Sequence, residues 1–300
     1  MADKQEDGKV FNVIQNVRMH QNSLNGAEPS AEAEIEENAA QEAAVQETAA
    51  ELNEIKSQAA PEENAQKEKS DLPPGDYLVL KNVSNANQKG NGRTLDNINI
   101  GIGSGEFVIL RGPSGCGKST LLRMIAGFEN ISSGEILLEG YNINNTPPDD
   151  RNISMIAQNY GIRDKENSKS RLSYGALSFD MSNYDNMAYD LKNKKVPKNI
   201  VDARVMEAAK LLDIDKLLKN KPQALSASQL CRVAIARAIT RYPKLFLFDD
   251  ILSGITGESR DNLLNELSDL RRSRKMTVIY TTSDQSNIFT DIADRVIDMK

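Results

Sequence analysis

The pattern of hydrophobic and polar residues along the chain changes near residue 77. Beyond it, short apolar runs alternate with stretches of helical periodicity. The runs are YLVLKNV (77–83), FVILR (107–111), GEILLEG (134–140), ISMIA (153–157), LFLFDD (245–250), MTVIYTT (276–282) and DRVIDM (294–299). Continuous apolar runs between helical segments are typical of strands that are buried on both faces. The pattern therefore predicts an α/β fold built on a largely parallel sheet.

Residues 183–240 carry mostly helical patterning and few strand signals. This stretch predicts a helical subdomain, at about residues 160–230, inserted into an α/β domain that spans residues 76–300.

The first 75 residues have a different composition. They hold 16 acidic and six basic residues, and 24 of the 44 residues at 27–70 are Ala or Glu, with no aromatic residue among them. Such a segment buries too little apolar surface to offset its ordering entropy, so residues 1–75 are expected to form a disordered acidic tail. The alternative is a partner-binding helix seeded by four apolar residues, Ile35, Val45, Leu52 and Ile55.

Composition narrows the function classes. The chain has no run of eighteen apolar residues and no apolar segment near its start, so neither a transmembrane helix nor a secretory signal is expected. Two cysteines make no disulfide framework and fit a reducing cytosol. The net charge of −6 argues against a dedicated nucleic-acid binder. The single histidine, His20, excludes histidine chemistry anywhere else in the chain.

A glycine-rich segment follows the expected strand at 107–111 and precedes the helical pattern LLRMIAGF. It matches G-x-x-x-x-G-K-[ST] in a strand–loop–helix context, which predicts a site for nucleotide phosphates. Backbone N–H groups and the helix N-terminus would face the phosphates, Lys118 would supply a positive charge, and Ser119 would ligate Mg²⁺. Cys116 is interpreted as a small filler. The predicted nucleotide-binding residues are Gly112, Pro113, Ser114, Gly115, Cys116, Gly117, Lys118, Ser119 and Thr120.

Two carboxylates follow the apolar run LFLF. Ligands of α/β sheets bind at the carboxyl ends of the strands, which is where these residues are expected. Asp249 is the candidate metal-side residue, and Asp250 is the candidate general base for attack of water on the γ-phosphate. The alternative is a pair of solvated loop aspartates.

From about residue 77 to residue 300 the chain resembles the ATP-binding subunits of ABC transporters, in the branch that imports sugars and glycerol phosphate. Three segments carry most of the resemblance: GEFVILRGPSGCGKSTLLRMIAGFENISSGEI, PPDDRNISMIAQNY and KPQALSASQLCRVAIARAITRYPKLFLFDD. The resemblance implies a P-loop NTPase (RecA-like) core that binds ATP and Mg²⁺. It also implies that Gln158 senses metal and water, that Ser226 and Gln229 belong to the signature motif, and that Ser283 lies in the switch loop.

The family's assembly is implied in the same way. Two nucleotide-binding subunits pair head to tail, and each ATP lies between one subunit's phosphate loop and the other's signature. Their closure moves transmembrane permease subunits, which a solute-binding protein supplies from outside. The resemblance places the chain on the cytoplasmic face of the plasma membrane, with no nucleic-acid partner.

The chain departs from the family pattern at five functional residues. Asn87 stands where an adenine-stacking aromatic residue is usual, and Ala227 and Ser228 replace two signature glycines. Asp250 replaces a glutamate and Ser283 replaces the switch histidine. Together these changes predict weakened ATP hydrolysis. The alternative is a non-catalytic regulatory or assembly subunit paired with an active paralogue.

Two further departures concern length. About fifteen extra residues, near 163–180, are expected to form either a surface loop or an altered docking surface for membrane subunits. The sequence stops just past the last expected strand, so the β-rich regulatory domain usual in this branch is not expected.

Overall fold

The computed structural model describes residues 76–85, 95–158, 176–283 and 292–300. All of them belong to one unit of the chain, Lys67–Lys300. The predicted tail at 1–75, Asn87, and residues 163–175 of the extra segment lie outside the described residues. No helix in the described ranges is both long enough and apolar enough to span a bilayer.

The centre of the fold is a five-stranded sheet in the order β6-β7-β8-β3-β9, in which all neighbouring strands are parallel. The prediction of an α/β fold with a parallel sheet is therefore confirmed. The strands are β3 (Phe107–Arg111), β6 (Ile153–Ile156), β7 (Leu245–Asp249), β8 (Thr277–Thr282) and β9 (Arg295–Asp298).

A second sheet is antiparallel, with four strands in the order β2-β1-β4-β5. Two runs that the pattern suggested for the parallel sheet, 77–83 and 134–140, lie here instead. β2 was not among the predicted strands, although LDNINIGIG alternates polar and apolar residues along much of its length. The strands are β1 (Asp76–Asn85), β2 (Leu95–Gly103), β4 (Ser133–Leu138) and β5 (Tyr141–Asn142).

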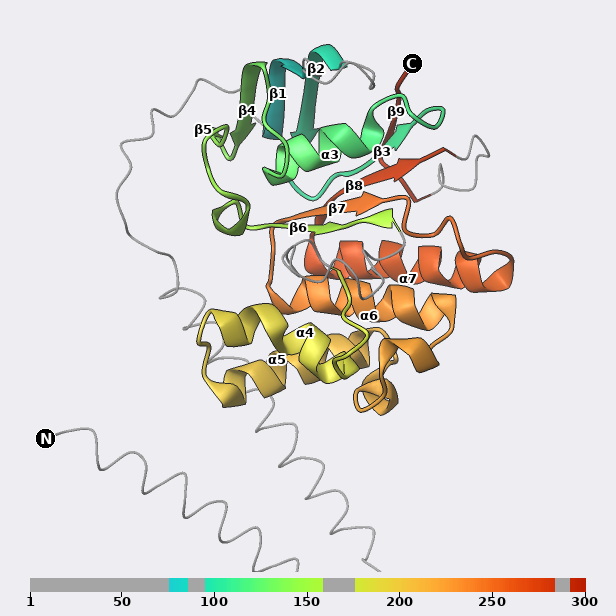
Figure 1. Ribbon diagram of the computed structural model, residues 1–300. Helices are drawn as coiled ribbons and strands as arrows, with labels where there is room; N and C mark the ends of the chain where they lie inside the picture. Colours follow the sequence, from blue (N-terminus) through green and yellow to red (C-terminus); the bar gives the residue numbers. More distant parts are fainter. Residues whose placement is uncertain (1–75, 86–94, 159–175, 284–291) are drawn as a thin grey trace, which may run out of the picture. The chain divides into compact units, whose positions relative to one another are not determined.

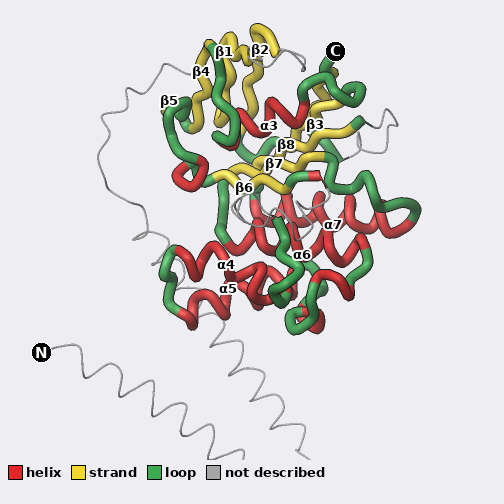
Figure 2. Tube along the Cα trace, viewed as in Figure 1, coloured by secondary structure: helices red, strands yellow, loops and turns green. Residues whose placement is uncertain are grey.

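Helices cover both faces of the parallel sheet (Figure 1). Since successive side chains of a strand point to opposite faces, alternate residues of β3, β7 and β8 enter two separate apolar clusters. One cluster joins Leu110, Leu247 and Ile279 to α3 (Lys118–Ala126). The other includes residues of α6 (Ala227–Thr240) and α7 (Glu258–Arg274). The result is a sheet sandwiched between helical layers, which Figure 2 shows as yellow strands flanked by red helices.

Between β6 and β7 the described part of the chain contains helices and 3-10 turns but no strand. α4 (Asn183–Asn193) and α5 (Lys198–Leu211) pack against each other and against α6. Two 3-10 turns, Asp215–Leu217 and Pro222–Ala224, lead into α6. This is where the sequence predicts an inserted helical subdomain. Its bounds of 160–230 stay a prediction.

Candidate functional site

Four of the predicted site segments meet at one edge of the parallel sheet. β6, β7, β8 and β3 all run in the same direction, so their carboxyl ends share that edge. Gln158 follows β6, Asp249 ends β7, Ser283 follows β8, and Gly112 follows β3. Strand order therefore brings together four segments that lie far apart in the sequence.

The phosphate loop is built around glycines that its backbone conformation or its close neighbours require. Gly115 and Gly117 have positive φ values of 81° and 103°, and Gly117 is the N-cap of α3. These φ values are in the left-handed region, which glycine adopts without a Cβ penalty. A Cβ on Gly112 would lie 2.4 Å from the carbonyl oxygen of Met299. The loop therefore leads directly into the N-terminus of α3, where free N–H groups favour a bound anion.

Lys118 places its charge inside this loop. The side chain is buried, and its Nζ donates to the carbonyl oxygens of Gly112 at 2.7 Å and Pro113 at 2.9 Å. Cys116 is also buried, with its Sγ 3.7 Å from the same Nζ. Among the described residues the partners of this buried ammonium group are neutral, which favours the approach of an anionic ligand.

The Asp249 carboxylate connects the loop helix to two strands. Its Oδ1 accepts a hydrogen bond from Ser119 Oγ at 2.8 Å and another from Thr281 Oγ1 at 2.8 Å. Asp249 is 6% exposed and Thr281 is fully buried. Thr281 was not among the predicted site residues. A pattern of buried strand residues cannot show which of them lies beside a given carboxylate.

Asp250 follows β7 in a strained turn. Its φ is 50°, a left-handed value that Asp tolerates better than most residues. Its N–H donates to Thr281 O at 3.2 Å, and its carbonyl oxygen accepts from Ser253 N and Ser253 Oγ at 3.2 and 2.9 Å. Leu252 N–H donates to the buried Tyr280 hydroxyl at 3.3 Å. Burial, together with the nearby charge of Asp250, raises the pKa of Tyr280 above its ordinary range.

The signature residues cap a helix. Ser226 is the N-cap of α6, where its hydroxyl accepts from Gln229 N–H and its own N–H donates to Gln229 Oε1. The hydroxyls of Ser226 and Ser228 lie 3.1 Å apart. Within the described ranges, neither Ser226 nor Gln229 hydrogen-bonds to the phosphate loop of the same chain.

The remaining predicted residues lie around the loop and the sheet edge. Thr120 Oγ1 accepts a 3.4 Å hydrogen bond from Arg123, one turn further along α3. Four side chains reach solvent and are free to contact a ligand or a second subunit. These residues are Pro113, Ser114, Gln158 and Ser283.

The donors at the loop fit Mg²⁺. The Ser119 hydroxyl and the Asp249 carboxylate supply hard oxygen ligands 2.8 Å apart. No group of three or more His, Cys, Asp or Glu residues suited to a metal occurs among the described residues. This donor set suits a cation that keeps several waters and shares nucleotide phosphates, as Mg²⁺ does.

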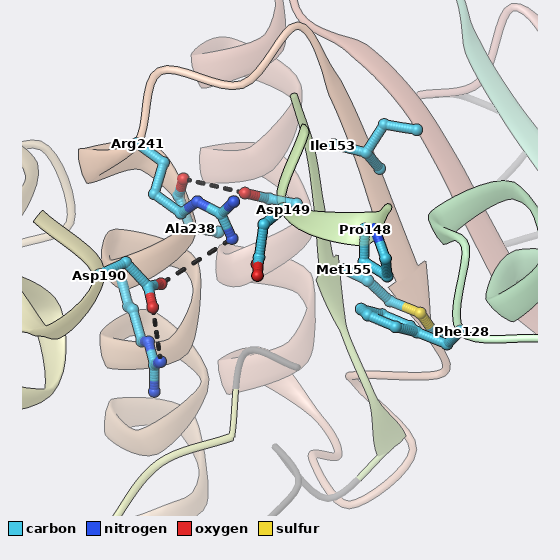
Figure 3. Close-up of a pocket in the computed structure, with 10 residues that line it drawn as sticks. Phe128, Pro148, Asp149, Ile153, Met155, Asp190, Ala238 and Arg241 are labelled. Atoms are coloured by element: carbon cyan, nitrogen blue, oxygen red, sulfur yellow. Dashed lines mark hydrogen bonds and ion pairs between the residues drawn. The ribbon is translucent and has the colours of Figure 1, made fainter. Parts of the chain in front are cut away.

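A separate pocket lies between β6 and the helices α4 and α6 (Figure 3). Phe128 and Met155 form an apolar part of its wall. The Asp190 carboxylate pairs with the guanidinium groups of Arg237 at 3.5 Å and Arg241 at 3.9 Å. None of the predicted site residues is among those that line it. Sequence reasoning missed this pocket, because its walls come from segments that are distant in the chain.

Comparison with known proteins identifies the family. The family model described as "ABC transporter" matches residues 95–253, which include the phosphate loop, the signature helix and both aspartates. The chain belongs to the ABC transporter family. The resemblance stated from the motifs is thus confirmed.

Relatives of this ABC transporter chain are named as import ATP-binding proteins. The chain is 43% identical over 222 residues to the sn-glycerol-3-phosphate import ATP-binding protein UgpC of Rhodopseudomonas palustris (strain BisA53), covering 74% of the chain and 57% of the relative. It is also 43% identical over 220 residues to UgpC of Brucella abortus (strain 2308), covering 73% and 58% respectively. The chain therefore spans a little over half the length of these relatives.

Solved structures support the same assignment. A dimeric bacterial ABC transporter cassette, MJ0796, has a TM-score of 0.61 and 26% identity, covering 74% of this chain and 94% of that one. CbiO1 of Clostridium perfringens, part of the ABC transporter complex CbiONQ, has a TM-score of 0.63 and 26% identity, with coverages of 75% and 85%. The P-loop NTPase fold of this ABC transporter chain is therefore confirmed.

Proposed function

We propose that this chain is the ATP-binding subunit of an ABC importer for a sugar or glycerol-phosphate solute. The observation that carries the proposal is the phosphate loop with the buried Lys118 ammonium, next to the Ser119–Asp249 hydrogen bond. Relatives at 43% identity named as importer ATP-binding proteins support the transport class.

The loop residues bind and orient the nucleotide. The N–H groups of the loop and of the first turn of α3 donate to phosphate oxygens. Lys118 exchanges its bonds to the Gly112 and Pro113 carbonyls for bonds to the β- and γ-phosphates. Mg²⁺, when bound, would neutralise negative charge on the nucleotide phosphates. The Ser119 hydroxyl would ligate the metal, and the Asp249 carboxylate would hold it through water.

Hydrolysis depends on three residues at the sheet edge. Asp250 accepts the proton of the attacking water, while Gln158 and Ser283 sense the water, metal and γ-phosphate. The Asp carboxylate is one methylene shorter than that of Glu, and a misplacement of roughly 1 Å costs on the order of 100-fold in rate. Ser283 offers a hydroxyl in place of an imidazole. We therefore expect tight MgATP binding with slow turnover.

The full ATP site is shared between two subunits. In the described part of the chain, Ser226 and Gln229 make no hydrogen bond to the phosphate loop, which fits a role toward the nucleotide of a second subunit. The dimeric cassette MJ0796 and the complex of CbiO1 support pairing and attachment to permease subunits. An indirect solute-binding partner and a position on the cytoplasmic face of the membrane follow from the same assignment.

Substitution of Lys118 tests nucleotide binding. Lys118→Ala is expected to abolish binding of a fluorescent ATP analogue in the presence of Mg²⁺, because it removes the main positive charge facing the phosphates. The control is Lys219→Ala, which changes an exposed lysine of the helical region. Circular dichroism checks that both variants fold. Equal retention of the analogue by wild type and Lys118→Ala would contradict the proposal.

A further inference from the structure

A buried hydroxyl that the proposed function does not use contacts the candidate magnesium site. Thr281, on β8, is fully buried, and its Oγ1 donates to Asp249 Oδ1 at 2.8 Å. The same oxygen accepts a hydrogen bond from Ser119 Oγ at 2.8 Å. We propose that Thr281 is a positioning residue for Mg²⁺ binding, acting through the Asp249 carboxylate. The inference rests on the proposed function, because it concerns the metal that accompanies ATP.

The order of the strands creates this contact. β8 lies between β7 and β3, so Thr281 is in register with Asp249 on one side and with Leu110 on the other. Residues in register on parallel strands project from the same face of the sheet. That face is the one covered by α3, whose first turn carries Ser119.

Asp249 is the strong partner of the Thr281 hydroxyl. The other acceptor near Oγ1 is the carbonyl oxygen of Phe248, at 3.5 Å, which is the outer limit for a hydrogen bond. A buried hydroxyl without a good acceptor is costly, so the Asp249 contact is strongly favoured. Thr281 therefore has a single preferred orientation, with its proton directed at Asp249.

The two hydroxyls leave one carboxylate oxygen available. Ser119 and Thr281 both donate to Oδ1, and no described residue hydrogen-bonds to Asp249 Oδ2. Fixing Oδ1 from two elements restricts rotation of the carboxylate, so Oδ2 stays free for the metal's coordination shell. Outer-shell partners of this kind orient metal ligands, and their loss typically costs about 10- to 100-fold in metal affinity.

Near-isosteric substitution tests the inference on the full chain. Thr281→Val removes the hydroxyl and keeps the side-chain shape, while Thr281→Ser restores a hydroxyl. Thr277→Val is the matched control, because Thr277 is a buried threonine of the same strand whose hydroxyl accepts Gly105 N–H at 2.9 Å, at the opposite end of β8. The readouts are binding of a fluorescent ATP analogue during a Mg²⁺ titration and Mn²⁺ binding followed by electron paramagnetic resonance.

Thr281→Val is expected to raise the half-saturating Mg²⁺ concentration about tenfold or more. In excess EDTA, the affinity of Thr281→Val for the analogue should match that of the wild type. Thr281→Ser should show a Mg²⁺ dependence close to that of the wild type. Thr277→Val should show the same Mg²⁺ dependence as the wild type. An unchanged Mg²⁺ dependence in Thr281→Val, or an equal shift in Thr277→Val, would overturn the inference.

Two further outcomes keep the test decisive. If Thr281→Val does not fold by circular dichroism, Thr281→Ala takes its place with the same expected shift. If the wild type binds the analogue with no dependence on Mg²⁺, the proposed magnesium site fails and this inference fails with it, whereas retention of the analogue by Lys118→Ala is the result that would contradict the proposed function. That result is distinct from one in which the wild type and Thr281→Val require Mg²⁺ equally, which would overturn this inference alone.

Discussion

Gly112 lies where β3 leads into the phosphate loop. The backbone of Met299, directly after β9, leaves no room there for a side chain. A Cβ there would lie 2.4 Å from Met299 O and 2.9 Å from Cys116 Sγ. Met299 does not move aside easily, because its N–H donates to Arg111 O at 2.7 Å. The requirement for glycine is therefore steric, and it is imposed by Met299, a residue far from Gly112 in the sequence.

Gly112→Ala is expected to lower the free energy of unfolding by about 1–3 kcal/mol through overpacking, and to weaken nucleotide binding. Urea unfolding and analogue titration measure the two effects. Gly254→Ala is the control, because a Cβ at Gly254 meets no atom within 4 Å. Stability of Gly112→Ala equal to that of the control would show that the loop and β9 adjust freely.

The catalytic positions are expected to act as a unit. Asp250→Glu and Ser283→His together should raise single-turnover hydrolysis by more than the product of the two single gains, since groups that act together are non-additive. The single Asp250→Glu gain is limited by the left-handed backbone at this position, where φ is 50°. Asp261→Glu, on the exposed face of α7, is the matched control. Absent or merely multiplicative gains would contradict this interpretation of the site.

At the scale of elements, α3 ends against a buried arginine. The helix stops at Gly127, with φ 85°, and Arg151 Nη1 donates to the carbonyl oxygens of Met124 and Ile125 at 2.9 and 2.8 Å. Arg151 is 5% exposed, and burial lowers its pKa to about 10. A cation at a helix C-terminus interacts favourably with the free carbonyls and the helix dipole. This contact ties the helix that follows the phosphate loop to the segment that precedes β6.

Arg151→Ala is expected to lower the free energy of unfolding by about 3 kcal/mol, because it removes the hydrogen bonds of a buried guanidinium to the carbonyl oxygens of Met124 and Ile125. Urea denaturation followed by circular dichroism measures the change. Arg272→Ala, at an exposed position of α7, should stay within about 0.5 kcal/mol of the wild type. A loss for Arg151→Ala as small as that of the control would mean that water replaces the guanidinium at the helix end.

At the scale of the whole molecule, deletion of residues 1–70 is expected to leave the melting temperature and the ATP affinity nearly unchanged. The reason lies in composition, because 24 of the 44 residues at 27–70 are Ala or Glu and few apolar residues there suit a core. Thermal unfolding and analogue titration of the truncated and full chains provide the measurement. A fall of many degrees on truncation would show that the segment contributes to the folded core.

Local pattern was sufficient for the strands of the parallel sheet and for the site motifs. Apolar runs of strand length predicted β3, β6, β7, β8 and β9, and the glycine-rich motif predicted the phosphate loop. The same reasoning missed β2, and it assigned no separate sheet to β1 and β4. The direction in which two strands pair depends on the path of the chain between them, which the strands' own residues do not specify.

By itself the sequence determined the fold class, the family, and the motifs from which the ATP site is proposed, because these depend on residues that are close together in the chain. Only the tertiary structure decided the strand order β6-β7-β8-β3, which lays Thr281 beside Asp249. It alone also revealed the left-handed turn at Asp250 and the contact of Met299 with Gly112. Each of these features joins or bends segments through packing between distant parts of the chain, and such packing has no local signature in the sequence.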